Sequence, residues 1–235
     1  MKILALDTTL SACSVACIAF DPDSGEVDVL ASARAAMARG HAEALVPMIE
    51  RTMADTGIAF GQLDRIAVST GPGSFTGLRV GVATARGLGL ALGIPVAGIV
   101  TLDALARDFA DANPGNKAPF AILLDARRGQ LYIRNFDATG IACDDPAVCD
   151  LAKAGDQISG PDCLLVGPGA DLLADHSLLD FVHGGIDRLP FPDGPSARNI
   201  AVIGAEENSA EFSPSPLYLR PADAKPQDHK SLARC

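Results

Sequence analysis

The sequence has little of what several classes of protein require. It has only 4 histidines, and its 19 lysines and arginines are outnumbered by 29 aspartates and glutamates. The net charge of −10 excludes attraction of nucleic acid over the whole surface, so contact with RNA needs a local patch or a partner protein. No run of about 18 residues is apolar and free of charge, which argues against a membrane span. Asp7 comes too early for the apolar region of a signal peptide, so we expect a cytoplasmic protein.

The spacing of cysteine and histidine argues against a disulfide scaffold and against a metal centre. None of the 6 cysteines forms a C-x-x-C pair. Cys13, Cys17 and Cys163 lie in apolar, strand-like runs and are predicted to be small core residues, whereas Cys235 is expected in an exposed tail. The histidines form neither an H-E-x-x-H nor an H-x-x-x-H pattern, and a catalytic zinc or iron needs about three converging ligands. We therefore predict no metal site.

The first half of the sequence contains a regular succession of strand and helix patterns. It predicts strands 3–6, 14–20 and 27–33, helix 42–55, strand 66–68, helix 76–92, strand 95–100 and helix 102–110. Leu45, Ile49 and Met53 recur at i, i+4 and i+8, as on one face of a helix. Thr101 is the expected N-cap of the last of these helices. Helices between the later strands indicate an α/β protein.

The second half looks like a weaker copy of the first. Strand 120–124 ends at Asp125, as strand 3–6 ends at Asp7, and strand 130–136 returns after a turn. Strand 164–166 then enters a second Gly-Pro-Gly loop. An internal duplication of this kind predicts two related lobes.

These patterns set the expected boundaries. We predict a first lobe of residues 1–112, a smaller second lobe of residues 113–195, and a flexible polar tail of residues 221–235. Residues 184–195 are expected to form a loop, and residues 196–207 a helix with a serine N-cap. The segment of about residues 196–220 is expected to pack back on the first lobe.

The sequence GPGSFTG at residues 71–77 is the most specific motif of the chain. A strand, a glycine loop and a helix can present free backbone N–H groups to a phosphate. However, no lysine follows the loop, so it is not a P-loop. Two readings stay open. Asp7, Thr8, Gly71, Gly73 and Asp125 could form a nucleotide site, or the two aspartates could simply end their strands and hold the turns. Ser74 or Thr76 is expected to cap the helix that follows.

That helix carries a ridge of small residues. Gly77, Gly81, Ala85, Gly89 and Gly93 recur every fourth position. Each glycine inside a helix costs about 1 kcal/mol relative to alanine, so close approach to another element must compensate. The ridge either packs on its own sheet or joins helix 42–55 in an interface with another subunit.

Several segments in order carry a family resemblance. They are ILALDTT, HAEALVPMI, GPGSFTGLRVGVATARGLGLALGIPVAGIVTLDALA, LLDARRGQLYI and PLYLRP. Together they resemble the TsaB family, formerly YeaZ, of tRNA threonylcarbamoyladenosine biosynthesis proteins. The resemblance implies a two-lobed actin/Hsp70/sugar-kinase-like (ribonuclease-H-like) α/β fold with a reduced second lobe.

The resemblance also implies a function and partners. TsaB proteins are non-catalytic partners of TsaD, which transfers a threonylcarbamoyl group to N6 of adenosine 37 in tRNAs that read ANN codons, and the ATPase TsaE joins them. The implied contacts are a homodimer in isolation, a heterodimer with TsaD, and tRNA through the complex. The implied partner interface lies on the two helices of the first lobe, at Leu45, Ile49, Gly77, Leu78, Gly81, Val82, Ala85 and Gly89. No cofactor is expected, except ATP or ADP at an interface with the partner.

One segment separates this chain from its catalytic relative. TsaD carries two metal-binding histidines after a comparable strand, and Thr101 and Leu105 stand in their places here. Since leucine cannot bind a metal, we expect no catalytic residues and no enzyme activity. Two other hypotheses stay open: an actin-like ATPase or kinase that uses Asp7 and the Gly-Pro-Gly loops, and, more weakly, a metallopeptidase.

Overall fold

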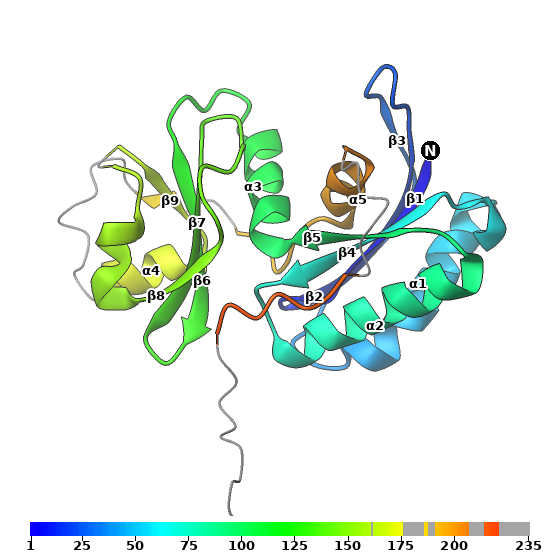
Figure 1. Cartoon of the computed structure of the whole chain (residues 1–235), viewed down its shortest axis with the longest axis horizontal. Coiled ribbons are helices and arrows are strands. Elements are labelled where there is room, and N and C mark those ends of the chain that lie inside the picture. The colour runs from blue at the N-terminus through cyan, green and yellow to red at the C-terminus, as the bar shows by residue number, and fades with distance from the viewer. Residues whose placement is uncertain (161, 176–185, 188–190, 207–213, 221–235) are drawn as a thin grey trace, which may run out of the picture.

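The computed structural model describes residues 1–160, 162–175, 186–187, 191–206 and 214–220, which form two α/β lobes side by side (Figure 1). The sheet of lobe one contains β1 (Lys2–Asp7), β2 (Ala12–Phe20), β3 (Val27–Ala36), β4 (Arg65–Gly71) and β5 (Val96–Val100). Their order is β3-β2-β1-β4-β5. The first three strands form the antiparallel meander expected from the sequence, and β4 and β5 continue the sheet in parallel with β1.

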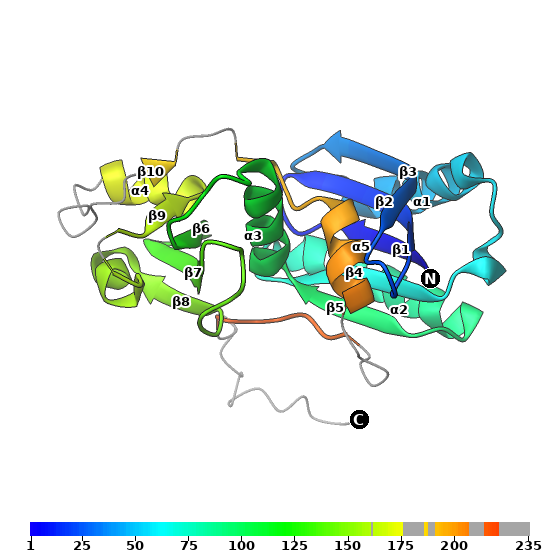
Figure 2. The same cartoon turned by 90° about the horizontal axis from the view of Figure 1, so that it is seen from above.

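Helices cover both faces of this sheet. On one face lie α1 (His41–Thr56) and α2 (Phe75–Leu92), and on the other lies α5 (Ala197–Glu206), which packs on β1, β2 and β4. Figure 2 shows α5 lying over the sheet near the second lobe. Because side chains alternate along a strand, Leu4 and Leu6 of β1 join the core under α1 and α2, whereas Ile3 and Ala5 join the core under α5. Both faces of β1 are therefore buried.

Lobe two repeats the topology of lobe one. Its elements are β6 (Phe120–Arg127), β7 (Gln130–Phe136), β8 (Ala147–Asp150), the 3₁₀ segment η2 (Leu151–Gln157), β9 (Leu164–Val166), α4 (Pro168–Asp175) and β10 (Ile186–Asp187). The strand order is β10-β9-β6-β7-β8, with β7 antiparallel and β9 parallel to β6. The predicted duplication is confirmed. The prediction of a continuous loop over 184–195 is wrong at Ile186–Asp187, which pairs in parallel with β9.

The helix α3 (Thr101–Ala112) connects the two lobes. Leu102, Leu105 and Phe109 pack with Phe120 and Phe136 in one apolar cluster, so α3 contributes to the core of lobe two. The prediction that Thr101 caps this helix is wrong. Val100 occupies the N-cap position, and the buried Thr101 hydroxyl has no partner among the described residues. By contrast, Ser74 caps α2 as predicted, since its Oγ accepts the Gly77 N–H at 3.3 Å.

Other sequence predictions concern cysteines, the tail and membrane spans. Cys13, Cys17 and Cys163 are buried core residues, and burial raises the pKa of each to about 11. Cys235 and the predicted tail 221–235 lie outside the described residues. None of the described helices combines the length and the apolar character that a membrane crossing requires.

Candidate functional site

Asp7, at the end of β1, is a buried carboxylate that accepts hydrogen bonds through one oxygen. The side chain is fully buried, and its Oδ1 accepts bonds from Thr9 N at 3.2 Å, from Thr9 Oγ1 at 2.7 Å and from the Ser69 hydroxyl. Oδ2 has no partner among the described residues, and a Cβ built on Gly194 would lie 3.1 Å from it. Burial raises the pKa of Asp7, against the lowering effect of its hydrogen bonds. Asp7 therefore holds the β1–β2 turn and lies beneath the segment at Gly194.

The first Gly-Pro-Gly loop packs directly on this turn. The Ser74 N–H donates to the Thr9 carbonyl at 2.7 Å, and a Cβ on Gly73 would lie 2.4 Å from that oxygen. Thr8 Oγ1 donates to the Gly77 carbonyl at 2.7 Å. The loop is close to the turn because only glycine leaves room for it. Its backbone groups therefore fasten two loops of the protein together.

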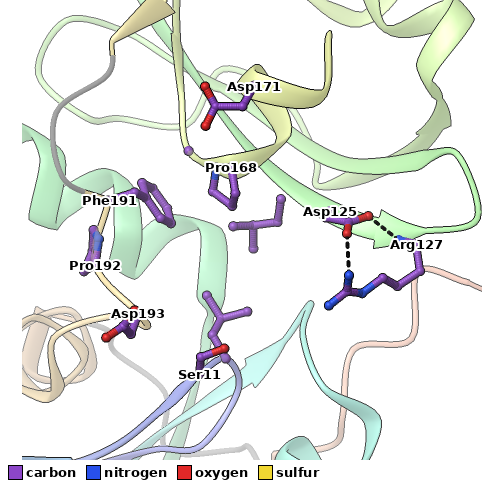
Figure 3. Close-up of a pocket in the computed structure, with 11 residues that line it drawn as sticks. Ser11, Asp125, Arg127, Pro168, Asp171, Phe191, Pro192 and Asp193 are labelled. Atoms are coloured by element: carbon purple, nitrogen blue, oxygen red, sulfur yellow. Dashed lines mark hydrogen bonds and ion pairs between the residues drawn. The ribbon is translucent and has the colours of Figure 1, made fainter. Parts of the chain in front are cut away.

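A cavity of about 610 Å³ lies between the lobes (Figure 3). Its charged lining residues are Asp125, Arg127, Asp171 and Asp193. The Arg127 side chain forms an ion pair with Asp125 Oδ2 at 2.9 Å, and its backbone N–H donates to Asp125 Oδ1 at 2.7 Å. The cavity lining thus holds three carboxylates and one guanidinium group, and that group is already paired with Asp125.

The five residues predicted as a nucleotide site do not form one site. Asp7, Thr8 and Gly73 come together around the β1–β2 turn, whereas Gly71 lies against Leu78 and Leu217, and Asp125 is the one of the five that lines the cavity. A phosphate needs cations or free N–H groups, whereas three of the four charged residues that line the cavity are aspartates. This charge pattern disfavours a nucleotide phosphate in the cavity. Across the described ranges, no group of three or more His, Cys, Asp or Glu side chains is placed to hold a metal ion.

The residues predicted as the partner interface are buried inside the chain itself. They are Leu45, Ile49, Gly77, Leu78, Gly81, Val82, Ala85 and Gly89. The prediction is wrong because the small-residue ridge faces the chain's own sheet. A Cβ on Gly81 would lie 2.6 Å from Thr8 Oγ1, and one on Gly89 would lie 2.3 Å from Val96 Cγ2. Substitution at Gly81 would therefore test folding of lobe one, not partner binding.

The outer face of the same two helices carries exposed apolar side chains. Leu90 of α2 is 87% exposed and Val46 of α1 is 49% exposed. The two helices contact each other, so their outer sides form one surface below the sheet (Figure 1). We call Val46, Ala83, Gly87 and Leu90 the outer helix face. The sequence analysis did not predict this face. The apolar Leu90 directly follows Gly89 of the small-residue ridge, so it must point to a different side of α2, and this was a signal for a second apolar face.

Comparisons with known proteins agree with this architecture. A family model described as tRNA N6-adenosine threonylcarbamoyltransferase matches residues 32–163. The Haemophilus influenzae protein TsaB is 31% identical over 180 residues, which cover 72% of each chain. An uncharacterized Mycobacterium leprae protein is 35% identical over 228 residues, and the match spans 95% of this chain but 56% of that protein. The solved structure of YeaZ from Pseudomonas aeruginosa superposes with a TM-score of 0.72 at 27% identity, covering 93% of this chain and 99% of that one.

The fold is a two-lobed α/β protein with the same strand order in both lobes, as the sequence predicted, and it is the fold of YeaZ. In this chain the lobe-one aspartate is fully buried, and aspartates make up three of the four charged residues that line the cavity between the lobes. The chain belongs to the TsaB (YeaZ) family.

Proposed function

We propose that this chain acts in the synthesis of threonylcarbamoyladenosine in tRNA, as an accessory subunit that binds and activates a TsaD-type transferase. Family membership is the observation that carries the proposal. The charge pattern of the cavity supports an accessory role, because it offers carboxylates where a nucleotide substrate would need cations. The subunit would thus contribute binding surface, while the partner supplies the chemistry at N6 of adenosine 37.

The outer helix face is the surface that we propose for the transferase. Burying a leucine side chain as exposed as Leu90 contributes about 1.5–3 kcal/mol to association. Gly87 and Ala83 are exposed one and two turns before Leu90, so a partner helix could approach closely. In the absence of the transferase, the same face would support a homodimer. A TsaE-type ATPase and tRNA would join the assembled pair.

The proposal leaves no nucleotide bound by this chain alone. ATP or ADP would be held only where the transferase supplies cationic groups at the interface. Calorimetry of the isolated chain with ATP and magnesium should then detect neither binding nor turnover. Robust hydrolysis by the chain alone would favour the actin-like ATPase hypothesis instead.

The decisive experiment compares two exposed aliphatic residues. Leu90→Asp places a charge on the outer helix face, whereas Ile141→Asp places one on lobe two, where Ile141 is 67% exposed. Because both side chains are exposed, both variants should fold with unchanged circular dichroism. We expect Leu90→Asp to lose copurification with a TsaD-type transferase and at least tenfold of the reconstituted threonylcarbamoyl transfer.

The Ile141→Asp variant should keep both properties. Unchanged copurification of Leu90→Asp would exclude the outer helix face as the interface. If omitting the chain altogether leaves transfer by TsaD-type and TsaE-type proteins unchanged, the accessory function itself is wrong.

A further inference from the structure

An exposed aromatic pair encloses an arginine at the start of α2. Phe75 is 56% exposed and Tyr218 is 49% exposed, although their ring centroids lie only 5.8 Å apart. The Arg79 guanidinium lies 3.7 Å from the Phe75 ring centroid, and its Nε donates to the Tyr218 hydroxyl at 3.0 Å. The stacking and the hydrogen bond orient three large side chains at the surface while leaving much of both rings open to solvent.

The C-terminal segment 214–220 extends this cluster across the lobes. Its Leu217 N–H donates to the Thr70 carbonyl at 2.7 Å in lobe one, and Arg220 Nη1 donates to the Ala126 carbonyl at 2.9 Å in lobe two. Figure 1 shows this segment in red, running from the lobe-one sheet to the end of β6. Ala126 directly precedes the turn that contains Arg127 and Arg128. The aromatic pair is therefore connected to a second group of arginines.

These residues make a local exception to the charge of the chain. The net charge is −10, yet Arg79 contacts Tyr218, Arg220 contacts Ala126, and Arg127 and Arg128 follow Ala126 in the sequence. Asp125 forms an ion pair with Arg127, whose side chain is nevertheless 84% exposed. In addition, α2 begins at Phe75, so the positive end of its dipole points toward the same edge. We call Phe75, Arg79, Arg127, Arg128, Tyr218 and Arg220 the aromatic–arginine patch.

We propose that the aromatic–arginine patch binds a single-stranded loop of RNA. Exposed aromatic rings and stacked guanidinium groups accept unpaired bases, and a line of arginines follows the phosphate backbone. The acidic remainder of the surface repels RNA, which confines binding to this edge. The identity of the RNA as a tRNA loop rests on the proposed function. The prediction that the patch binds unpaired bases next to phosphates rests on its own residues and not on that function.

The first experiment uses the isolated full chain at low salt. A short RNA stem–loop is compared, by fluorescence anisotropy, with a fully paired RNA of equal charge. We expect the chain to prefer the stem–loop and the double variant Phe75→Ala/Tyr218→Ala to weaken binding at least about tenfold, since each lost stack removes a sequence-tolerant contact. Tyr218→Phe keeps the ring and should retain most of the affinity. The matched control Ile141→Ala, at an exposed position of lobe two, should bind as the unaltered chain does.

The arginines of the patch should contribute to the salt dependence of RNA affinity. Arg128→Gln should weaken binding to both RNAs and reduce the slope of log affinity against log salt by about 1. Equal binding of the two RNAs, or unchanged affinity in both the aromatic and the arginine variants, would overturn the proposal.

The second experiment separates this proposal from the accessory function. Copurification with a TsaD-type transferase is measured for Phe75→Ala/Tyr218→Ala and for Leu90→Asp. We expect the aromatic variant to retain the transferase but to lose stem–loop affinity in the complex. We expect Leu90→Asp to lose the transferase but to keep stem–loop affinity as an isolated chain. Loss of the transferase with intact RNA binding in the aromatic variant would make the patch a protein contact and refute the RNA proposal. If no complex forms with any variant, the accessory function fails, while the isolated-chain titration still decides the RNA site.

Discussion

Asp7 and Asp125 occupy the same place in the two halves of a duplicated fold, but their surroundings differ. Each lies near the end of the first strand of its lobe. Asp7 is fully buried and accepts three hydrogen bonds on one oxygen. Asp125 lines a cavity and pairs with an exposed arginine. One topology has therefore produced a structural carboxylate in lobe one and a solvent-accessible one in lobe two.

The turns that follow the two aspartates also differ in their contacts and backbone conformation. In lobe one, α2 has 18 residues, and its first turn contacts Thr8 in the turn after β1. In lobe two, α4 has 8 residues, and the corresponding turn holds Arg127, Arg128 and Gly129 at positive φ. In lobe two, Arg127 of this turn lines the cavity between the lobes. Lobe one thus buries its aspartate, whereas the turn of lobe two carries an exposed arginine.

The two Gly-Pro-Gly loops can be compared in the same way, by what their last glycine contacts. A Cβ on Gly73 would lie 2.4 Å from the Thr9 carbonyl, and one on Gly169 would lie 2.8 Å from Leu123 Cβ. In both lobes the last glycine of the loop permits close packing on the first strand or its turn. The shared motif therefore reflects a shared packing requirement and is not by itself a sign of phosphate binding.

The largest effect should come from breaking the contact between α2 and the turn of lobe one. In Gly77→Ala, the new Cβ would lie 1.9 Å from the Thr8 carbonyl oxygen. We expect a loss of about 4 kcal/mol in the free energy of unfolding, above the usual cost of overpacking because backbone must move. Gly87→Ala, on the same helix with open space around it, should instead gain about 0.5–1 kcal/mol. Urea unfolding of both variants tests this, and a similar response of the two would contradict the tight contact.

A second effect concerns Asp108, where α3 meets α5. Its carboxylate accepts the Ser196 N–H at 2.8 Å and Asn199 Nδ2 at 2.7 Å. Burial nevertheless raises the pKa of Asp108 from 3.8 to about 6. The folded state then binds the proton more tightly than the unfolded state, so this group makes stability fall as pH rises from about 4 to 6. The total is about 3 kcal/mol, since one pKa unit corresponds to about 1.4 kcal/mol.

Asp108→Asn should remove that pH dependence. Asparagine loses one of the two hydrogen bonds, which lowers stability by a constant amount at every pH. The difference between the unaltered chain and the variant should therefore change by about 3 kcal/mol between pH 4 and pH 7 in urea titrations. A difference that stays constant over this range would show that the Asp108 pKa is not raised.

The contrast between Asp7 and Asp125 can be tested directly with matched substitutions. Asp7→Ala leaves the Ser69 hydroxyl and the Thr9 N–H buried without their acceptor and should cost about 2–3 kcal/mol. Asp125→Ala removes an ion pair whose arginine is 84% exposed and should cost less than about 1 kcal/mol. Thermal and urea unfolding should agree on this order. Equal costs would mean that the two strand ends are equivalent after all.

Much of this architecture could be predicted from the sequence. The alternation of strands with helices, the buried stripe of Leu45, Ile49 and Met53, and the repeated Gly-Pro-Gly loops gave the two-lobed fold with small boundary errors. β8 and β10 were missed because strands of four and two residues carry too little periodicity. These successes rest on local patterns, which sequence reasoning reads well.

The candidate site was harder because it depends on orientation and on distant contacts. A stripe of small residues permits close approach to a sheet or to another helix, and only the packing of Gly81 on Thr8 decides between them. The hydrogen bond between Arg79 and Tyr218 joins residues 139 positions apart. Neither residue stands out alone in the sequence. Exposed surfaces are therefore where the structure added most.

The smallest effect isolates backbone strain in the turn of lobe two. Gly129 has φ +72° and open space around the position of a Cβ, so Gly129→Ala tests conformation without a clash. We expect a loss of about 1 kcal/mol, the usual cost of the left-handed region for a residue with a Cβ. Gly93→Ala, at φ +68° and equally open at the end of α2, is the matched control in lobe one. Equal costs in urea unfolding would show that both backbones hold these angles firmly. A much smaller cost at Gly129 would mean that the lobe-two turn relaxes, and that only the lobe-one backbone is held firmly at its left-handed angle.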